Sequence, residues 1–230
     1  MTAEAATKDA LLHHLRHAAA LGLWRAGAVR VNVEEPFTLA SGKQSPIYIN
    51  CRRLISSPAF LGLFTAVAAT LVEAGELRFD AVAGGETAGI PFAAYLARDT
   101  GKPMLYVRKQ PKGYGIASRV EGVLPCAAAD GGDRPRVLLV EDLITDGGSK
   151  LGFIDALREA GAVVEDALVL FDRQQGGLDT LAGHGVCLTA VTDLETALAV
   201  GTATGALDET TLATVRAYLT DPDGWNAARA

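Results

Sequence analysis

Residues 136–149 read RVLLVEDLITDGGS, and this stretch decides the fold. Its short apolar run, Val137–Val140, is typical of a buried strand in a parallel sheet. The small residues Thr145–Ser149 then form a glycine turn, and apolar residues recur at helical spacing from Leu151 onward. The stretch therefore predicts a strand, a glycine turn and a helix. Free backbone N–H groups and the positive end of a helix dipole attract phosphate, so we expect an anion site at the turn.

Two neighbouring carboxylates, Glu141 and Asp142, follow the apolar run and precede the turn. The spacing matches neither the GxxxxGK[ST] phosphate loop nor the GxGxxG dinucleotide loop. Because carboxylates repel phosphate, we expect this pair to face a hydroxylated group such as a ribose, or a magnesium ion. An ordinary strand–helix turn with a surface acid pair is the alternative interpretation.

The composition predicts one globular α/β domain. The chain has 230 residues, of which 49% are hydrophobic, and a formal net charge of −6. The acidic balance and the lack of a long apolar run argue against a nucleic-acid or membrane partner. Three widely spaced cysteines fit neither a disulfide framework nor a zinc site, and no signal peptide is recognisable, so we expect a cytoplasmic protein.

Apolar periodicity and turn residues predict further elements along the chain. We expect helices over 7–26, 58–75, from residue 90 onward, and within 191–199 and 208–218, and strands over 47–50, 79–83, 104–107 and 163–171. The carboxyl ends of parallel strands lie at one edge of a sheet. We therefore expect the segments that follow the core strands to meet at a single site.

The stretch EDLITDGGS at 141–149 resembles the phosphoribosyl-diphosphate (PRPP) signature of the type I phosphoribosyltransferases. The resemblance implies a central, mainly parallel sheet flanked by helices, with an N-terminal hood and a mobile lid. It implies that Thr145, Asp146, Gly147, Gly148 and Ser149 hold the 5-phosphate, with the Asp146 carboxylate pointing outward. Glu141 and Asp142 would hold the ribose hydroxyls as catalytic residues, and Mg²⁺ would be the cofactor. Neither acid is expected to bind the metal directly, although contact through water is compatible with the pattern.

The segment PFTLASGKQSPIYIN at 36–50 resembles the hood of one subgroup, the orotate phosphoribosyltransferases. By this resemblance Ser41 and Lys43 lie near the substrate, and Tyr48 forms a wall of the base pocket. Some members carry a lysine where this chain has Ala40, so no diphosphate contact is expected there. A hairpin at the edge of the domain is the alternative.

A second glycine turn, GGETAG at 84–89, matches the turn that holds the diphosphate in the resembling family. Thr87 is therefore expected to bind substrate. Ala88 stands where a lysine is common, so positive charge must come from elsewhere. Glu86 is unusual here, because an acid beside diphosphate is costly unless it binds metal or points away.

The cationic segment RKQPKGYG at 108–115 resembles the lid of the same subgroup, which closes over diphosphate and reaches across a dimer. Arg108, Lys109 and Lys112 fall on matching positions, with Lys109 as a catalytic residue. Tyr114 replaces a histidine, and a phenol can still donate a hydrogen bond. The resemblance implies a homodimer that shares the lid.

The DRQ sequence at 172–174 follows the strand predicted over 163–171. In the resembling subgroup its arginine, here Arg173, presents a planar bidentate donor to the carboxylate of orotate. The expected function is therefore transfer of phosphoribosyl from PRPP to orotate. A phosphoribosyltransferase for another base is one alternative. A non-catalytic PRPP-sensing regulator is the other, although the acidic charge and the short segment before the hood disfavour a DNA-binding module.

The expected organisation is a single domain over 1–230. Residues 1–57 comprise the N-terminal helix and hood, 58–200 the PRPP-binding core, and 201–230 a helical tail. The tail matches no part of the resembling family, and we expect it to serve in packing.

Overall fold

A six-stranded sheet forms the centre of the molecule, in a computed structural model that describes residues 3–39, 41–74, 76–111, 118–126 and 134–229. The strand order is β10-β9-β8-β5-β6-β7. The strands are β5 (Ala81–Gly85), β6 (Met104–Val107), β7 (Val120–Glu121), β8 (Val137–Ile144), β9 (Asp166–Asp172) and β10 (Cys187–Asp193). All neighbouring pairs are parallel except β6 and β7. The α/β fold with a mainly parallel sheet is confirmed.

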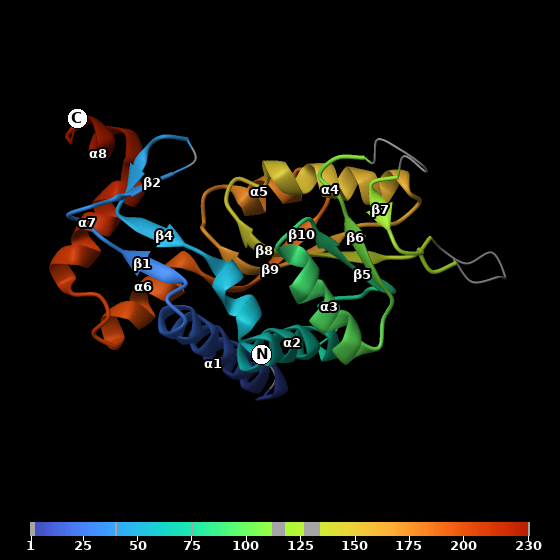
Figure 1. Cartoon of the computed structure of the whole chain (residues 1–230). Helices are drawn as coiled ribbons and strands as arrows, with labels where there is room; N and C mark the ends of the chain where they lie inside the picture. The colour runs from blue at the N-terminus through green and yellow to red at the C-terminus, as the bar shows by residue number, and fades with distance from the viewer. Residues whose placement is uncertain (1–2, 40, 75, 112–117, 127–133, 230) are drawn as a thin grey trace.

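Helices cover both faces of this sheet (Figure 1). On one face lie α4 (Gly148–Glu159) and α5 (Gly177–Ala182), and on the other α1 (Ala3–Arg25), α2 (Pro58–Glu73), α3 (Gly89–Thr100) and α6 (Leu194–Ala203). Each face has its own apolar core. Along β8, Leu138 and Val140 belong to the α1–α2–α3 core, whereas Val137 and Leu139 belong to the α4 core. This alternation, inherent to a strand, decides where the acid pair points.

The N-terminal hood is built from two small antiparallel pairs. One joins β1 (Val29–Val31) to β4 (Ile47–Ile49), and the other joins β2 (Phe37–Thr38) to β3 (Gln44–Ser45). A 3-10 helix, η1 (Cys51–Ser56), leads from the hood into α2. The tail forms α7 (Glu209–Thr220) and α8 (Pro222–Ala227), which lie beside the hood in Figure 1.

Three core strands differ in their boundaries from the sequence-based prediction. β5 spans Ala81–Gly85 and not 79–83, because its pairing with β8 begins at Ala81 and its pairing with β6 continues to Gly85. β8 extends through the acid pair to Ile144, because β9 continues to pair with it as far as Asp172. β9 begins at Asp166 and not at Val163, since Val163 makes only an isolated bridge to Arg136. An apolar run marks the buried middle of a strand and gives its ends poorly.

Within the described residues, no helix has both the length and the apolar character needed to cross a membrane.

Candidate active site

The two acids of β8 point to opposite faces of the sheet because they are neighbours in a strand. Glu141 is 5% exposed and continues the row of Val137 and Leu139 toward α4. Asp142 is half-buried and continues the row of Leu138 and Val140 toward the hood side. Sequence analysis predicted that the two acids face the same group, whereas in the structure each carboxylate has different neighbours.

Glu141 forms an ion pair with Lys150 of α4, and both side chains are buried. Its second oxygen, Oε1, has no hydrogen-bond partner among the described residues. Burial raises the pKa of Glu141, and the attraction of Lys150 offsets part of this effect. Sequence analysis missed Lys150, although a lysine directly after a phosphate loop is a local signal that could have been used.

Glycines make room for the Glu141 carboxylate. A Cβ added at Gly85 would lie 2.2 Å from Glu141 Oε1, and one at Gly89 would lie 2.4 Å from both Oε1 and the Val140 carbonyl oxygen. These two residues bracket the second glycine turn. The turn is therefore glycine-rich partly because it packs directly against the buried acid.

The predicted phosphate loop joins β8 to α4. Gly147 adopts φ 85° and ψ −14° immediately before the helix, a left-handed conformation that favours glycine. Gly148 and Ser149 are exposed. Asp146 is exposed, and its Oδ1 accepts a hydrogen bond from the Gly148 N–H at 3.0 Å. One amide of the loop is thus used by the loop's own acid.

Glu86 fastens the base of the lid to the second glycine turn. Its Oε2 accepts a hydrogen bond from the Lys109 backbone N–H at 2.8 Å, and its own N–H donates to the Val107 carbonyl at 2.9 Å. The Glu86–Thr87 peptide bond is cis, and Thr87 is exposed. This contact explains an acid that the sequence left without a role.

The strands β6 and β7 pair at the base of the lid, and the residues that flank them, Arg108 and Arg119, continue the pairing. The Arg108 N–H donates to the Arg119 carbonyl at 2.8 Å, and Arg119 Nε donates to the Arg108 carbonyl at 3.0 Å. The Arg108 guanidinium lies 3.9 Å from Glu121, so its side chain follows β7. Lys112 and Tyr114 lie outside the described residues.

These elements enclose a cavity of about 530 Å³ at the carboxyl ends of the strands. Six predicted residues line it: Thr87, Lys109, Glu141, Asp142, Gly148 and Ser149. Three cations that the sequence did not single out also line it, namely Arg52, Arg119 and Lys150. They come from η1, the segment just before β7 and α4, and only the tertiary fold brings them together. With Lys109 they give four cations against Glu86, Glu141 and Asp142.

Arg173 lies beyond this cavity lining, at the end of β9. Its N–H donates to the Ile144 carbonyl at 3.0 Å, and its side chain is half-buried. The flanking residues fix it: Asp172 accepts the Gln174 N–H at 2.7 Å, and Gln174 Oε1 accepts the Glu195 N–H at 3.0 Å. Burial lowers the pKa of Arg173.

The surroundings of Arg173 come from the hood and the tail. Tyr48, the buried Cys51 and the tail residue Tyr218 lie within electrostatic reach of its guanidinium. Burial raises the pKa of the Cys51 thiol well above its usual range. Phe37 packs against Tyr48 with ring centroids 5.7 Å apart. Tyr48 and Arg173, both predicted to contact the base, are thus neighbours, and Tyr218 is a further neighbour that sequence analysis did not indicate.

Lys43 lies apart from the cavity lining. Its ammonium pairs with Asp223 of α8 at 2.5 Å, and both side chains are exposed.

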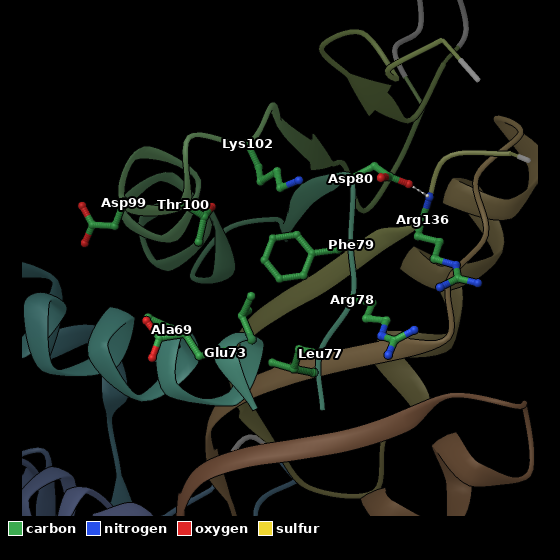
Figure 2. A pocket seen from close by; sticks show the side chains of 11 residues that line it. Ala69, Glu73, Leu77, Arg78, Phe79, Asp80, Asp99, Thr100, Lys102 and Arg136 are labelled. Carbon is green, nitrogen blue, oxygen red and sulfur yellow. Dashed lines mark hydrogen bonds between the residues drawn. The ribbon is translucent and has the colours of Figure 1, made fainter. Parts of the chain in front are cut away.

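A second cavity of about 530 Å³ lies at the opposite edge of the sheet, among the segments that lead into β5, β6 and β8. Figure 2 shows Phe79 in its wall, with Lys102, Arg78 and Arg136 around it. The helix ends at this edge are carboxyl ends, those of α2 and α3, and it contains neither glycine turn. Size alone does not separate the two cavities, but the loops at their rims do.

Comparison with known proteins agrees with this geometry. Residues 52–199 match the phosphoribosyl transferase domain. The chain belongs to the phosphoribosyltransferase family. An orotate phosphoribosyltransferase of Cereibacter sphaeroides is 49% identical over 206 residues, which cover 88% of this chain and 86% of that protein. The predicted family resemblance is therefore confirmed.

Two solved structures are similar to this phosphoribosyltransferase in both sequence and fold. The orotate phosphoribosyltransferase of Aeropyrum pernix is 34% identical, with a TM-score of 0.63, and the match covers 78% of this chain and 96% of that one. Leishmania donovani UMP synthase is 31% identical, with a TM-score of 0.73 over 89% of this chain. The present chain spans only 42% of that longer protein.

Proposed function

We propose that this phosphoribosyltransferase transfers the phosphoribosyl group of PRPP to orotate, giving orotidine 5′-monophosphate and diphosphate. The observation that carries the proposal is the strand-end cavity, in which a phosphate-type loop, an acid pair and four cations converge. A substrate with a phosphate at one end, hydroxyls in the middle and a diphosphate leaving group has complementary chemistry along its length. The relatives named above support orotate as the accepting base.

The reaction forms a bond between an orotate ring nitrogen and the anomeric carbon, and breaks the bond from that carbon to diphosphate. Positive charge develops on the sugar ring while negative charge gathers on the leaving group. The protein therefore acts mainly by positioning and by electrostatic stabilisation. The exposed residues Gly148 and Ser149 suit the 5-phosphate, Asp142 and Glu141 suit the ribose hydroxyls, and Lys109, Arg119 and Arg52 suit the diphosphate.

Magnesium fits the donors at this site as a partner of the substrate. Carboxylate and diphosphate oxygens are ligands that Mg²⁺ prefers, and it commonly keeps several waters. Among the described residues no cluster of three or more His, Cys, Asp or Glu side chains could hold a metal ion. Asp142 would therefore contact the ion through water or ribose oxygens, whereas Glu141 Oε1 is buried against Gly85 and Gly89. When bound, the ion would neutralise diphosphate charge.

Arg173 would decide the choice of base. A guanidinium binds a carboxylate through two parallel hydrogen bonds, and among common bases orotate is the one that carries a carboxylate. The half-buried position of Arg173 among Tyr48, Tyr218 and Cys51 suits this role. A homodimer that shares the lid, and a cytoplasmic location, remain part of the proposal by family resemblance.

The direct test is turnover. Purified protein with PRPP and Mg²⁺ is expected to consume orotate, followed by its ultraviolet absorbance, and to leave adenine, guanine, hypoxanthine and uracil unchanged. Arg173→Ala is expected to raise the orotate KM strongly and to leave the KM for PRPP nearly unchanged. Turnover of another base would identify the alternative transferase. PRPP binding without turnover of any base would favour a sensor.

A further inference from the structure

The tail helix α8 is hydrogen-bonded to the hood through one side chain. Asn226 Oδ1 accepts the Gln44 backbone N–H at 2.8 Å, and Asn226 Nδ2 donates to the Gln44 carbonyl at 3.1 Å. The same Nδ2 also donates to the Pro222 carbonyl at 2.7 Å within α8. One amide side chain thus satisfies both backbone groups of a residue 182 positions away, as a neighbouring strand would.

Other tail residues fasten the hood around this point. Arg229 donates to the Val33 carbonyl at 3.0 Å, and its guanidinium lies 4.6 Å from the centre of the Trp225 ring. Lys43 pairs with Asp223. The exposed ion pair contributes little to stability. The hydrogen bonds to backbone groups contribute more, and they also fix the position of the hood.

The fastened hairpin has little stability of its own. β2 and β3 contain two residues each, and isolated two-stranded hairpins are at best marginally stable in water. The hairpin nevertheless carries Phe37, which packs against Tyr48 beside Arg173. Its position over the base end of the site therefore depends on an external support.

The tail also reaches the base end directly. Tyr218 of α7 is 4% exposed and packs edge-to-face against Trp225, with ring centroids 5.3 Å apart. It lies within electrostatic reach of both Arg173 and Lys43. The same helical pair that holds the hairpin thus places a side chain next to the predicted base-binding arginine. Residues 208–229 fall outside the matched domain at 52–199.

We propose that α7 and α8 hold the hood over the base end of the active site, with Asn226 as the positioning residue for the β2–β3 hairpin. The proposal rests on the proposed function for its kinetic consequence, but the structural part stands without it. Asn226 contacts the hood at Gln44 and acts on the substrate site only through the hood. Its effect should therefore fall on the base and spare PRPP.

The test compares Asn226→Ala with Arg216→Ala as a matched control. Arg216 makes an exposed ion pair between α7 and Glu195 of α6, so the control removes a tail contact that does not touch the hood. Losing two hydrogen bonds of about 1 kcal/mol each should raise the orotate KM about 5- to 30-fold in Asn226→Ala. The PRPP KM and kcat should stay within about twofold, because the hood contributes to binding of the base and not to PRPP binding or to the chemical step. Arg216→Ala should match the wild type.

Hydrogen exchange gives a readout that needs no activity. The Gln44 amide should exchange much faster in Asn226→Ala than in the wild type or in Arg216→Ala, while amides of β8 stay equally protected. Asn226→Asp keeps an acceptor for the Gln44 N–H and should restore part of this protection, which keeps the test available if the alanine variant folds poorly. Unchanged Gln44 exchange and unchanged orotate KM would overturn the proposal. Failure of the wild type to turn over orotate would instead overturn the proposed function alone.

Discussion

The Asp146 carboxylate adds a negative charge to the predicted phosphate loop. It accepts the Gly148 N–H, and it places a negative charge beside the exposed amides that are proposed to bind the 5-phosphate. A phosphate must therefore approach against this charge and compete for one amide. The contact is an Asx turn, in which an Asp side chain accepts the N–H two residues on, so TDGG at 145–148 carried a local signal for it that sequence analysis did not use.

Asp146→Asn is expected to bind PRPP more tightly than the wild type. The substitution keeps an oxygen that can accept the Gly148 N–H but removes the charge, and exposed charges interact by about 0.2–1 kcal/mol, so the PRPP KM should fall up to about fivefold. The difference should shrink in high salt, which screens exposed charges. Asp155→Asn makes the same change at an exposed position on α4 and should leave the KM unchanged. An equal or higher KM in Asp146→Asn would show that charge does not limit phosphate binding.

At the scale of elements, the second glycine turn is defined by what lies behind it. Gly85 and Gly89 pack against the Glu141 carboxylate, and Glu86 holds the base of the lid. A strand, a turn and a helix are thus fitted to a buried ion pair that joins β8 to α4. Close approach of this kind tolerates no added atoms unless the backbone moves.

Gly89→Ala is expected to destabilise the protein by about 1–3 kcal/mol, the usual cost of overpacking a core. The new Cβ would lie 2.4 Å from a backbone carbonyl oxygen, which cannot move aside as a side chain could. Gly62→Ala is the matched control, because Gly62 lies in the exposed face of α2 and its added Cβ meets nothing within 4 Å. That change should stabilise the helix by about 0.4–1 kcal/mol. Urea denaturation measures both, and equal effects of the two substitutions would contradict the packing described.

The lid makes a second prediction at this scale. Lys109→Ala retains the backbone N–H that bonds to Glu86 and removes only the ammonium that lines the cavity. If the ammonium stabilises the departing diphosphate, kcat should fall about 10²- to 10³-fold, as for other lost donors at developing charge. The orotate KM should change little. Lys102→Ala, at the opposite edge of the sheet, removes an exposed lysine as a control. Unchanged kcat in Lys109→Ala would exclude this role.

The sequence predicts contiguous elements well and tertiary clusters poorly. EDLITDGGS, the glycine turn and RKQPKGYG each carry their signal within about ten residues, and the sheet brings their ends together as expected from parallel strands. Arg52 and Arg119 were missed because their positions depend on how η1 and the segment before β7 pack, whereas Lys150 was missed although it directly follows the phosphate loop. The separation of Glu141 from Asp142 was missed because β8 outlasts its apolar run. For the tail, sequence analysis predicted packing only, because Asn226 and Gln44 are distant in sequence.

At the scale of the whole molecule, the buried charged residues among those described are Glu141, Lys150 and Asp172, which lie in or next to β8 and β9 on the side of the site. Burial raises the pKa of both Glu141 and Asp142. A carboxyl whose folded pKa exceeds its unfolded value of about 3.9 stabilises the fold fully only at lower pH, and this contribution is lost as pH rises through the folded pKa. The fold therefore disfavours the charged form of Asp142.

Asp142→Asn is expected to raise stability at neutral pH while it removes activity. Below about pH 3.9 the two proteins carry the same charge at this site, so their unfolding temperatures should coincide. Above the folded pKa only the wild type holds a buried charge, so the variant should unfold at a higher temperature, by about 2–4 °C for each 1 kcal/mol gained. The gap should therefore open as pH rises, the opposite of what a stabilising salt bridge would give. If the wild type were the more stable protein at pH 7, attraction to Arg52 and Lys150 would outweigh the burial of Asp142. Ionisation of Asp142 would then stabilise the fold, contrary to the prediction.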